Sequence, residues 1–256
     1  MIMSIQNYKK KHGFEHFEPK AVLFDMDGVL VNSMPLHAVA WNRSMASFGI
    51  TMTAEDAYMT EGARGIDTIR HFVKQQQNKD ITLEEAQRMY DEKARIFATF
   101  PRPRLMYGAR TLLRTLKQQG LQIAIVTGSG QRPLINRLLH DFREFIDEQH
   151  LVTAYDVSRG KPHPDPYLLG MEKCGTKPWE TIVVENAPLG VQAGVASRAF
   201  TIAVNTGPLP DEKLLERGAD LLVPSLTALN AHFVIGFPRR RRTLFLQFLT
   251  EYIPLP

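Results

Sequence analysis

Short runs of apolar residues alternate along the chain with longer segments in which apolar positions recur at helical spacing. Residues 21–24, 121–126, 151–154, 181–184, 200–204 and 221–223 form such runs and predict strands. Helical patterns lie between most of them, as in residues 109–119, 133–139 and 189–197. Continuous apolar strands separated by helices are typical of a parallel sheet that is covered on both faces. We therefore predict an α/β fold with a doubly wound parallel sheet.

One long interval interrupts this alternation between the first and second predicted strands. Its excess, residues 34–103, contains several helical patterns and no good strand, whereas a plain crossover needs only about 30 residues. Residues 82–100 begin with a capping box from Thr82 to Glu85 and continue as an amphipathic helix. We predict a small α-helical cap at 34–103, inserted into a Rossmann-like core of residues 1–33 and 104–230. Residues 231–256 are expected to be a C-terminal tail without a catalytic role.

Composition and charge narrow the possible partners and the compartment. The chain has 256 residues and a net charge of +4, and much of this surplus lies in the arginine run 239–242. One local basic run is weak support for nucleic-acid binding, and no apolar stretch reaches the length of a membrane span. A single cysteine fits a reducing compartment, and the first residues lack the apolar core of a signal peptide. We expect a cytoplasmic protein that binds neither nucleic acid nor membranes, in an oligomeric state left open.

Polar residues of a few chemical types follow four of the predicted strands. They are Asp25 and Asp27 after the first strand, Thr127, Gly128 and Ser129 after the second, Lys161 in the loop after the third, and Glu185 and Asn186 after the fourth. Ligands of open parallel sheets bind beyond the carboxyl ends of the strands, so we expect these side chains to converge. Carboxylates, a hydroxyl, an ammonium and an amide are the parts of a magnesium and phosphate site.

Each residue type has a physical reason to be in such a site. Mg²⁺ prefers hard oxygen ligands, which Asp25, Glu185 and Asn186 could supply together with a main-chain carbonyl near Asp27. The metal then offsets the repulsion between the carboxylates and an incoming phosphate. The groups that can hold the phosphate oxygens are the side chains of Lys161 and Thr127 and the amides of Gly128 and Ser129.

The two aspartates of the first strand end can divide the chemistry between them. With the phosphate held in place, Asp25 can attack phosphorus and form an aspartyl phosphate. Asp27 can protonate the departing oxygen and then deprotonate the acceptor, which is water or a second hydroxyl. We therefore predict Asp25, Asp27, Thr127 and Lys161 as the catalytic residues.

The motifs “DMDGVL”, “VTGS”, “GKPHPDPY” and “VVENAPLG” occur in this order between residues 20 and 230. Together they resemble the motifs of the haloacid dehalogenase-like hydrolases, and the chain is most similar to the β-phosphoglucomutase-like and sugar-phosphate phosphatase subgroup. The resemblance implies a Mg²⁺ cofactor, Asp25 as nucleophile and Asp27 as acid and base. It also implies Thr127 and Lys161 as phosphate ligands and Glu185 and Asn186 as metal ligands.

The sequence departs from that pattern at several positions. The fourth motif carries Asn186 where the family has an aspartate, which removes one negative charge from the metal site. A lysine that β-phosphoglucomutases carry after the serine of the second motif is absent, since Gly130, Gln131 and Arg132 stand there. Arg64 matches the cap arginine for a distal phosphate only approximately in register. A mutase must hold two phosphates and a phosphatase only one, so these departures favour hydrolysis.

Three cap residues are further candidates for contact with substrate: His37, Arg64 and Lys93. His37 lies near the start of the cap and could serve as a hinge or substrate-facing group, or pack within the cap. Lys93 could face the substrate or be a solvated helix lysine, and Arg64 has the same two interpretations.

These observations predict a Mg²⁺-dependent phosphatase of small phosphorylated metabolites, with sugar phosphates as the expected substrates. One alternative is a β-phosphoglucomutase that converts β-glucose 1-phosphate to glucose 6-phosphate. A second alternative is a non-catalytic phosphometabolite-binding protein, a hypothesis motivated by Asn186.

Overall fold

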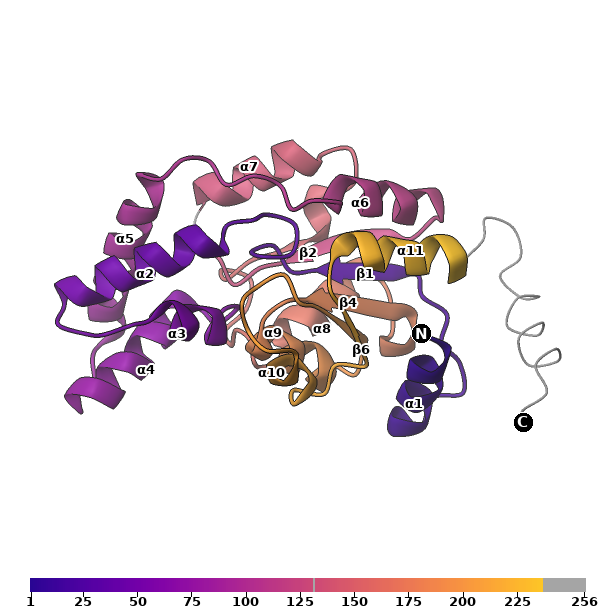
Figure 1. The fold of residues 1–256 in the computed structure, drawn as a ribbon, viewed down its shortest axis with the longest axis horizontal. Helices are drawn as coiled ribbons and strands as arrows, with labels where there is room; N and C mark the ends of the chain where they lie inside the picture. The colour runs from indigo at the N-terminus through magenta and orange to yellow at the C-terminus, as the bar shows by residue number, and fades with distance from the viewer. Residues whose placement is uncertain (131, 237–256) are drawn as a thin grey trace.

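The computed structural model describes residues 1–130 and 132–236. Six parallel strands form one sheet in this part of the chain, in the order β3-β2-β1-β4-β5-β6 (Figure 1). The strands are β1 (Ala21–Phe24), β2 (Gln122–Val126), β3 (Leu151–Val152), β4 (Thr181–Glu185), β5 (Phe200–Val204) and β6 (Leu221–Val223). The predicted parallel sheet is confirmed, and the strand ends differ from the apolar runs by at most two residues.

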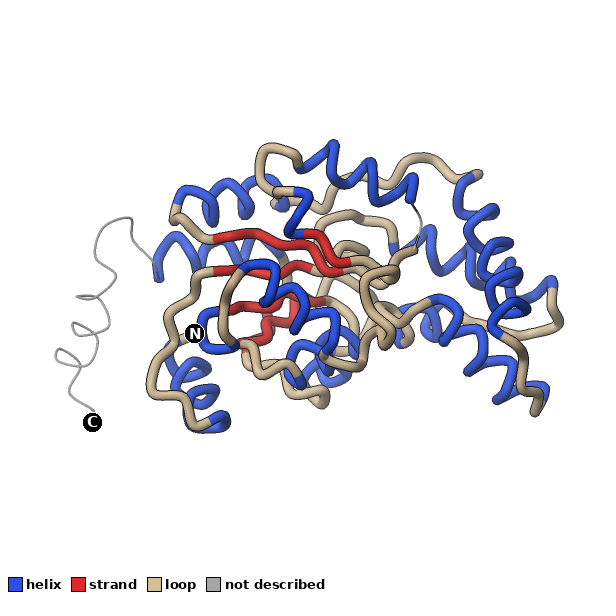
Figure 2. The backbone as a smooth tube through the Cα atoms, turned by 180° about the vertical axis from the view of Figure 1, so that it is seen from behind, coloured by secondary structure: helices blue, strands red, loops and turns tan. Residues whose placement is uncertain are grey.

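Helices cover both faces of this sheet. Those of the core are α1 (Ile2–His12), α6 (Ala109–Gln118), α7 (Arg132–Phe142), α8 (Asp165–Cys174), α9 (Pro188–Ala196), α10 (Asp211–Leu215) and α11 (Leu226–Gly236). Helices α6, α7 and α11 lie on one side of the sheet, and α8, α9 and α10 lie on the other (Figures 1 and 2). The doubly wound arrangement that the alternation predicted is therefore present.

The apolar runs are continuous because both faces of each strand are buried. Successive side chains of a strand point to opposite faces of the sheet. In β1, Val22 and Phe24 pack into the large hydrophobic cluster under α6, α7 and α11, whereas Leu23 packs with Tyr167 and Met171 of α8. This two-sided burial fixes the register of β1 between β2 and β4, and with it the position of the residues that follow the strand.

Between β1 and β2 every regular element of residues 34–103 is a helix. These helices are α2 (Met34–Ser47), α3 (Ala54–Met59), α4 (Gly65–Gln77) and α5 (Leu83–Ala98). They share a hydrophobic cluster that includes Trp41, Ile69 and Met89 and is separate from the clusters of the sheet. The predicted capping box is present: Glu85 N donates to Thr82 Oγ1 at 3.1 Å, and Thr82 N donates to Glu85 Oε2 at 2.8 Å. We propose that these helices form the cap.

The two chain segments that connect the cap helices to the sheet run side by side. Val31 and Leu105 form an antiparallel bridge, and Asn32 N donates to Arg104 O at 2.8 Å. The chain therefore leaves the core and returns to it at one place, so both linkers of the cap are tied together close to the end of β1.

Two helices correct or extend the expectations. Helix α11 continues past residue 230, the predicted end of the core, to Gly236. Phe233 of this helix is fully buried in the large cluster, so α11 packs against the core beyond residue 230. Helix α1 was not predicted, because its polar and basic sequence shows little apolar periodicity. The remaining tail, residues 237–256, and its arginine run lie outside the described residues.

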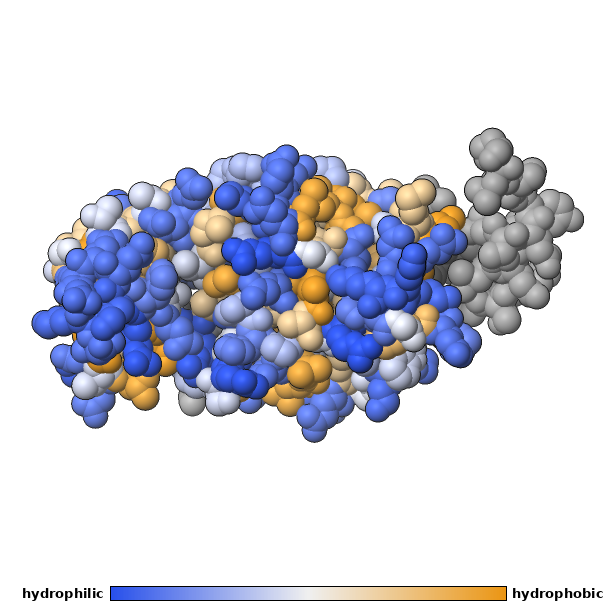
Figure 3. Space-filling view, turned by 90° about the horizontal axis from the view of Figure 1, so that it is seen from below, coloured by the Kyte–Doolittle hydropathy of each residue, from blue (hydrophilic) through white to orange (hydrophobic). Residues whose placement is uncertain are grey.

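The surface of the described part mixes polar and apolar side chains. Hydrophilic residues cover much of the cap end in the view from below, and apolar residues appear there in small separate groups (Figure 3). Within residues 1–130 and 132–236, no helix combines the length and the apolar character that crossing a membrane requires.

Helix α1 is attached to the core mainly through Tyr8. This side chain is 0% exposed, and its hydroxyl donates to the carbonyl oxygens of Arg198 at 2.8 Å and Pro178 at 3.1 Å. We expect Tyr8→Phe to lower the free energy of unfolding by about 1–2 kcal/mol, because both carbonyl oxygens lose their shared donor. Urea denaturation measures this change.

Tyr107→Phe is the matched control, because Tyr107 is 86% exposed. We expect that control to stay within about 0.5 kcal/mol of the parent chain. Equal stability of the two variants would show that α1 is not held through the Tyr8 hydroxyl.

Candidate active site

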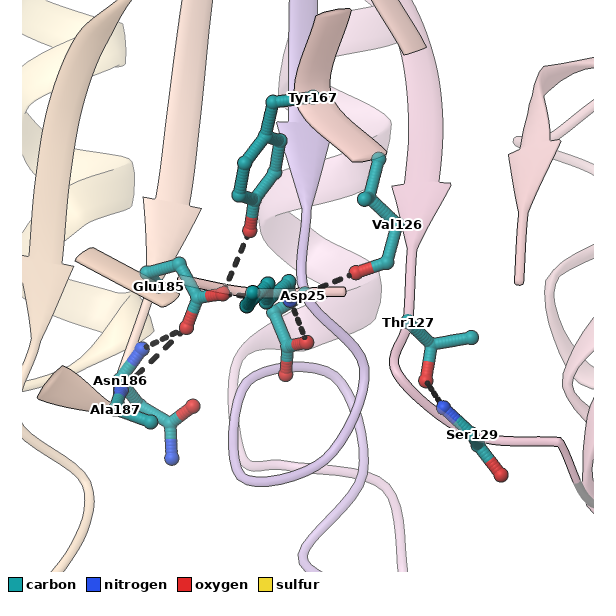
Figure 4. Close-up of polar contacts among 9 residues, drawn as sticks. Asp25, Val126, Thr127, Ser129, Tyr167, Glu185, Asn186 and Ala187 are labelled. Carbon is teal, nitrogen blue, oxygen red and sulfur yellow. Dashed lines mark hydrogen bonds and ion pairs between the residues drawn. The ribbon is translucent and has the colours of Figure 1, made fainter. Parts of the chain in front are cut away.

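A buried ammonium group lies at the carboxyl ends of the central strands. Lys161 Nζ donates to Asp25 Oδ1 at 2.5 Å, to Glu185 Oε1 at 2.7 Å and to the carbonyl oxygen of Val126 at 3.0 Å. Figure 4 labels the three acceptor residues. Lys161 is only 2% exposed. Burial alone would lower the pKa of Lys161, but the carboxylates of Asp25 and Glu185 raise it above its usual value. This side chain is therefore charged.

The strands place the three charged groups from distant parts of the sequence. Asp25 directly follows β1, and its N–H donates to the carbonyl oxygen of Val184 at 3.0 Å, which continues the ladder with β4. Glu185 is the last residue of β4, and Lys161 lies in the loop between β3 and α8. Tyr167 of α8 donates from its hydroxyl to Glu185 Oε1 at 2.6 Å. The sheet and α8 thus hold both carboxylates around one ammonium.

Two glycines leave the space that this arrangement needs. A Cβ atom at Gly190 in α9 would lie 1.9 Å from Glu185 Oε1, and one at Gly28 would lie 2.1 Å from Asn186 Nδ2. Gly28 also has a φ of 86°, a conformation that side chains with a Cβ rarely adopt. Larger residues at either position would displace Glu185 or Asn186.

Two buried oxygen atoms of the site have no hydrogen-bond partner among the described residues: Asp25 Oδ2 and Asn186 Oδ1. Burial of an unpaired polar atom is costly, so these two oxygens are suited to accept a bond from a ligand. In the described part of the chain, no group of three His, Cys, Asp or Glu side chains lies close enough together to hold a metal ion. At this site, Lys161 lies between the carboxylates of Asp25 and Glu185. One carboxylate oxygen and one amide oxygen nevertheless fit the preference of Mg²⁺ for hard oxygen ligands.

Burial also changes the protonation of Asp25. The loss of water raises the pKa of Asp25, while Lys161 lowers it and Glu185 and Asp27 raise it further. A cation bound to the free oxygen would favour the ionised carboxylate in the same way as Lys161 does.

Asp27 is connected to the cap through a buried chain of hydrogen bonds. Its Oδ1 accepts from the Ser33 hydroxyl at 2.5 Å and lies 3.2 Å from His37 Nε2. His37 Nδ1 in turn lies 2.7 Å from Lys93 Nζ, and the His37 ring stacks on Phe97 at 4.1 Å. Burial alone would raise the pKa of Asp27, but His37 and Ser33 outweigh this effect and hold the pKa below its usual value. The structure thus brings His37 and Lys93 to Asp27, and neither is a solvated surface residue.

The second strand end lies beside this chain. Thr127 is 3% exposed, and its Oγ1 accepts from the N–H of Ser129 at 3.0 Å (Figure 4). Gly128 and Ser129 line a small cavity together with Asp27. The hydroxyl and the loop amides that the sequence identified therefore lie at the same edge of the sheet as Asp25.

The cavity between cap and core has a volume of about 30 Å³, and its lining includes a residue that the sequence analysis missed. Glu61, in the loop between α3 and α4, lines this space with Asp27 and Lys93. Burial and the charges of Asp27 and Asp25 raise the pKa of Glu61 well above its usual value. Burial lowers the pKa of Lys93 to about 8, against the opposing effect of Glu61 and Asp27. The only signal for Glu61 was its position in the loop “EGARGID”.

Arg64 lies in a different part of the cap–core boundary. It lines a groove of about 680 Å³ that adjoins the small cavity. Its guanidinium forms two hydrogen bonds with Asp67, from Nε to Oδ2 at 2.7 Å and from Nη2 to Oδ1 at 3.1 Å. Arg64 is thus paired with a residue of its own helix start and is not among the described residues around Asp27. Gln131 lies outside the described residues.

The chain belongs to the haloacid dehalogenase-like hydrolases, whose family description matches residues 22–204. Hexitol phosphatase A of Escherichia coli (strain K12) is 37% identical over 207 residues, which cover 81% of this chain and 91% of that protein. A phosphorylated carbohydrates phosphatase of Thermotoga maritima is 30% identical over 213 residues, which cover 82% of this chain and 97% of that protein. A solved structure from Bacteroides vulgatus, provisionally named a β-phosphoglucomutase, is 45% identical with a TM-score of 0.88; the match covers 92% of this chain and 97% of that one.

The loop that carries Glu61 touches the core through glycines. A Cβ atom at Gly128 would lie 2.5 Å from the carbonyl oxygen of Gly62, so the two backbones are in direct contact. We expect Gly128→Ala to push the cap loop 60–64 away from the core, because a carbonyl oxygen cannot yield as a flexible side chain can. Hydrogen exchange read by mass spectrometry should show faster exchange in a peptide covering this loop.

Gly130→Ala is the matched control in the same core loop. A Cβ atom at Gly130 would meet the Tyr155 side chain at 3.5 Å and Ala154 Cβ at 3.9 Å, which are ordinary contact distances. Its exchange should equal that of the parent chain. Unchanged exchange in Gly128→Ala as well would mean that the cap loop does not rest on Gly128 in solution.

Proposed function

We propose that this haloacid dehalogenase-like hydrolase is a Mg²⁺-dependent phosphatase of small phosphorylated metabolites, with sugar and polyol phosphates as substrates. The observation that carries the proposal is the position of Lys161, whose buried ammonium holds Asp25 and Glu185 at the carboxyl ends of neighbouring strands. The phosphatase names of the Escherichia coli and Thermotoga maritima relatives support the same class of substrate.

In the first chemical step, a carboxylate oxygen of Asp25 attacks phosphorus and the bond from phosphorus to the ester oxygen breaks. The negative charge of the bound phosphate opposes the lowering of the Asp27 pKa by His37 and Ser33, and the protonated Asp27 gives its proton to the departing oxygen, which leaves as an alcohol. Lys161, Thr127 and the amides of the 127–129 loop stabilise the charge on the phosphoryl oxygens as it redistributes.

In the second step, Asp27 takes a proton from water while the water oxygen attacks phosphorus. The bond from phosphorus to Asp25 breaks, so inorganic phosphate leaves and the carboxylate of Asp25 is restored. His37 and Ser33 act as positioning residues in this scheme, because their contacts at 3.2 Å and 2.5 Å fix the Asp27 carboxyl as it loses and gains its proton.

Mg²⁺ fits the oxygen atoms that the described residues leave without a partner. Asp25 Oδ2 and Asn186 Oδ1 would hold the ion, together with Glu185 and a main-chain carbonyl near Asp27. When bound, the metal neutralises negative charge on the phosphate and on the carboxylates.

A phosphatase is favoured over a mutase by the state of Arg64. A mutase must bind a second phosphate while the bisphosphate intermediate turns round, and that requires a free cation in the cap. The guanidinium of Arg64 is already paired with Asp67 through two hydrogen bonds. A β-phosphoglucomutase is still the second candidate function, because the Bacteroides vulgatus structure with that provisional name is 45% identical.

The first test is release of phosphate from hexitol phosphates in the presence of Mg²⁺. We expect the parent chain to release inorganic phosphate and Asp25→Asn to lose about 10³-fold or more of this activity, because an amide cannot act as the nucleophile. Asp80→Asn changes a surface carboxylate that is paired with Lys74, and it should retain the activity.

Product analysis with β-glucose 1-phosphate separates the candidates. Free phosphate and glucose indicate the phosphatase, and glucose 6-phosphate indicates the mutase. Binding of phosphorylated metabolites without any turnover of a broad panel would overturn both and leave the non-catalytic binding protein.

The second test concerns Asn186. We expect Asn186→Asp to bind Mg²⁺ about tenfold more tightly, because a charged carboxylate replaces a neutral amide among the ligands. Titration calorimetry of the protein with Mg²⁺ measures this affinity directly. Asn7→Asp, on the exposed side of α1, adds the same charge far from the site and should leave the affinity unchanged. Equal affinity of both variants would remove Asn186 from the metal site.

A further inference from the structure

The loop between α3 and α4 places one carboxylate of the cap opposite the aspartates of the core. Glu61 and Asp27 line the same cavity of about 30 Å³, which has room for only one or two water-sized groups. Any leaving group whose oxygen reaches Asp27 must therefore come close to Glu61 as well. No described residue forms a hydrogen bond or ion pair with the Glu61 side chain, so its carboxyl oxygens are available to a ligand.

We propose that Glu61 is a specificity-determining residue, which selects phosphate esters of uncharged hydroxylated chains and disfavours substrates with a second anionic group near the ester. This inference rests on the proposed phosphatase function, since it concerns the leaving group of that reaction. It assigns a substrate preference to a cap residue outside the motifs that carry the chemistry.

The charges around the cavity support this preference. Lys93 is the cation of the cap that lines it, but its ammonium is already engaged: it lies 2.7 Å from His37 Nδ1 and 5.0 Å from the centre of the Trp41 ring. The same ammonium interacts with the charges of both Glu61 and Asp27. A second anion would therefore meet two carboxylates, and among the described side chains that line the cavity no cation is free to balance it.

An uncharged polyol brings no second negative charge to the cavity. A hydroxyl can donate to Glu61 when the carboxylate is ionised and accept from it when the carboxyl is protonated. Thr60 and Trp41 also line the cavity, so a residue with a hydroxyl and an aromatic residue lie around the same space as Glu61. The hydrogen bond to a substrate hydroxyl is therefore available in both protonation states of Glu61, whereas repulsion of a second anion comes from its ionised form.

The experiment compares matched substrate pairs in which a terminal CH₂OH is replaced by a carboxylate. The pairs are glycerol 3-phosphate with 3-phosphoglycerate, and ethylene glycol monophosphate with phosphoglycolate, so that in both pairs the carboxylate lies close to the ester. We expect the parent chain to show a higher kcat/KM for the polyol ester of each pair that it hydrolyses. Glu61→Gln should reduce the ratio between polyol and carboxylate substrates by about tenfold or more, and Glu61→Lys should reduce it further.

Glu84→Gln is the matched control, because Glu84 is exposed in the first turn of α5, and it should retain the ratio of the parent chain. Both members of a pair carry the same phosphate ester, so general damage to the site lowers both kcat/KM values and does not move the ratio. An unchanged ratio in Glu61→Gln and Glu61→Lys, with the parent chain active on polyol esters, overturns this inference and leaves the phosphatase intact. No phosphate from either polyol ester and from a wider panel overturns the proposed function itself.

Discussion

One buried ammonium between two buried carboxylates is the interaction on which the site depends. Asp25 and Glu185 belong to different strand ends, and both are almost fully removed from water. Without Lys161 their charges would repel each other in a medium of low polarity, where an unbalanced buried charge costs about 3–5 kcal/mol. The position of Lys161 thus allows the sheet to hold the proposed nucleophile, Asp25, and the proposed metal ligand, Glu185, side by side.

Glycines around these groups leave space for their side chains and allow a close contact between cap and core. Gly190 and Gly28 leave room for Glu185 and Asn186, and Gly62 and Gly128 let the cap loop rest directly on the core. Asp27 is the point where core and cap meet, because its carboxylate contacts His37 of the cap helix α2 and faces Glu61 across the small cavity. In the proposed mechanism, binding of the leaving group and positioning of Asp27 are therefore coupled through the same few side chains.

The sequence predicted the sheet and the strand-end residues because both follow from local patterns. A strand that is buried on both faces must be continuously apolar, and the groups that follow it must lie at one edge. The contacts between cap and core could not be predicted in this way. Whether Lys93 points to His37, or Arg64 to Asp67, depends on how helices far apart in the sequence pack. Helix α1 and the end of α11 were missed because tertiary contacts of Tyr8 and Phe233, and not periodicity, hold them.

The central claim is that Asp25 becomes phosphorylated during turnover. Rapid acid quench of the enzyme with a hexitol phosphate, followed by borohydride reduction and peptide mass spectrometry, tests it directly, because borohydride converts an aspartyl phosphate to homoserine. The account predicts homoserine at position 25 only when substrate is present. Turnover with an unmodified Asp25 at every quench time, or with the modification at another carboxylate, would contradict it.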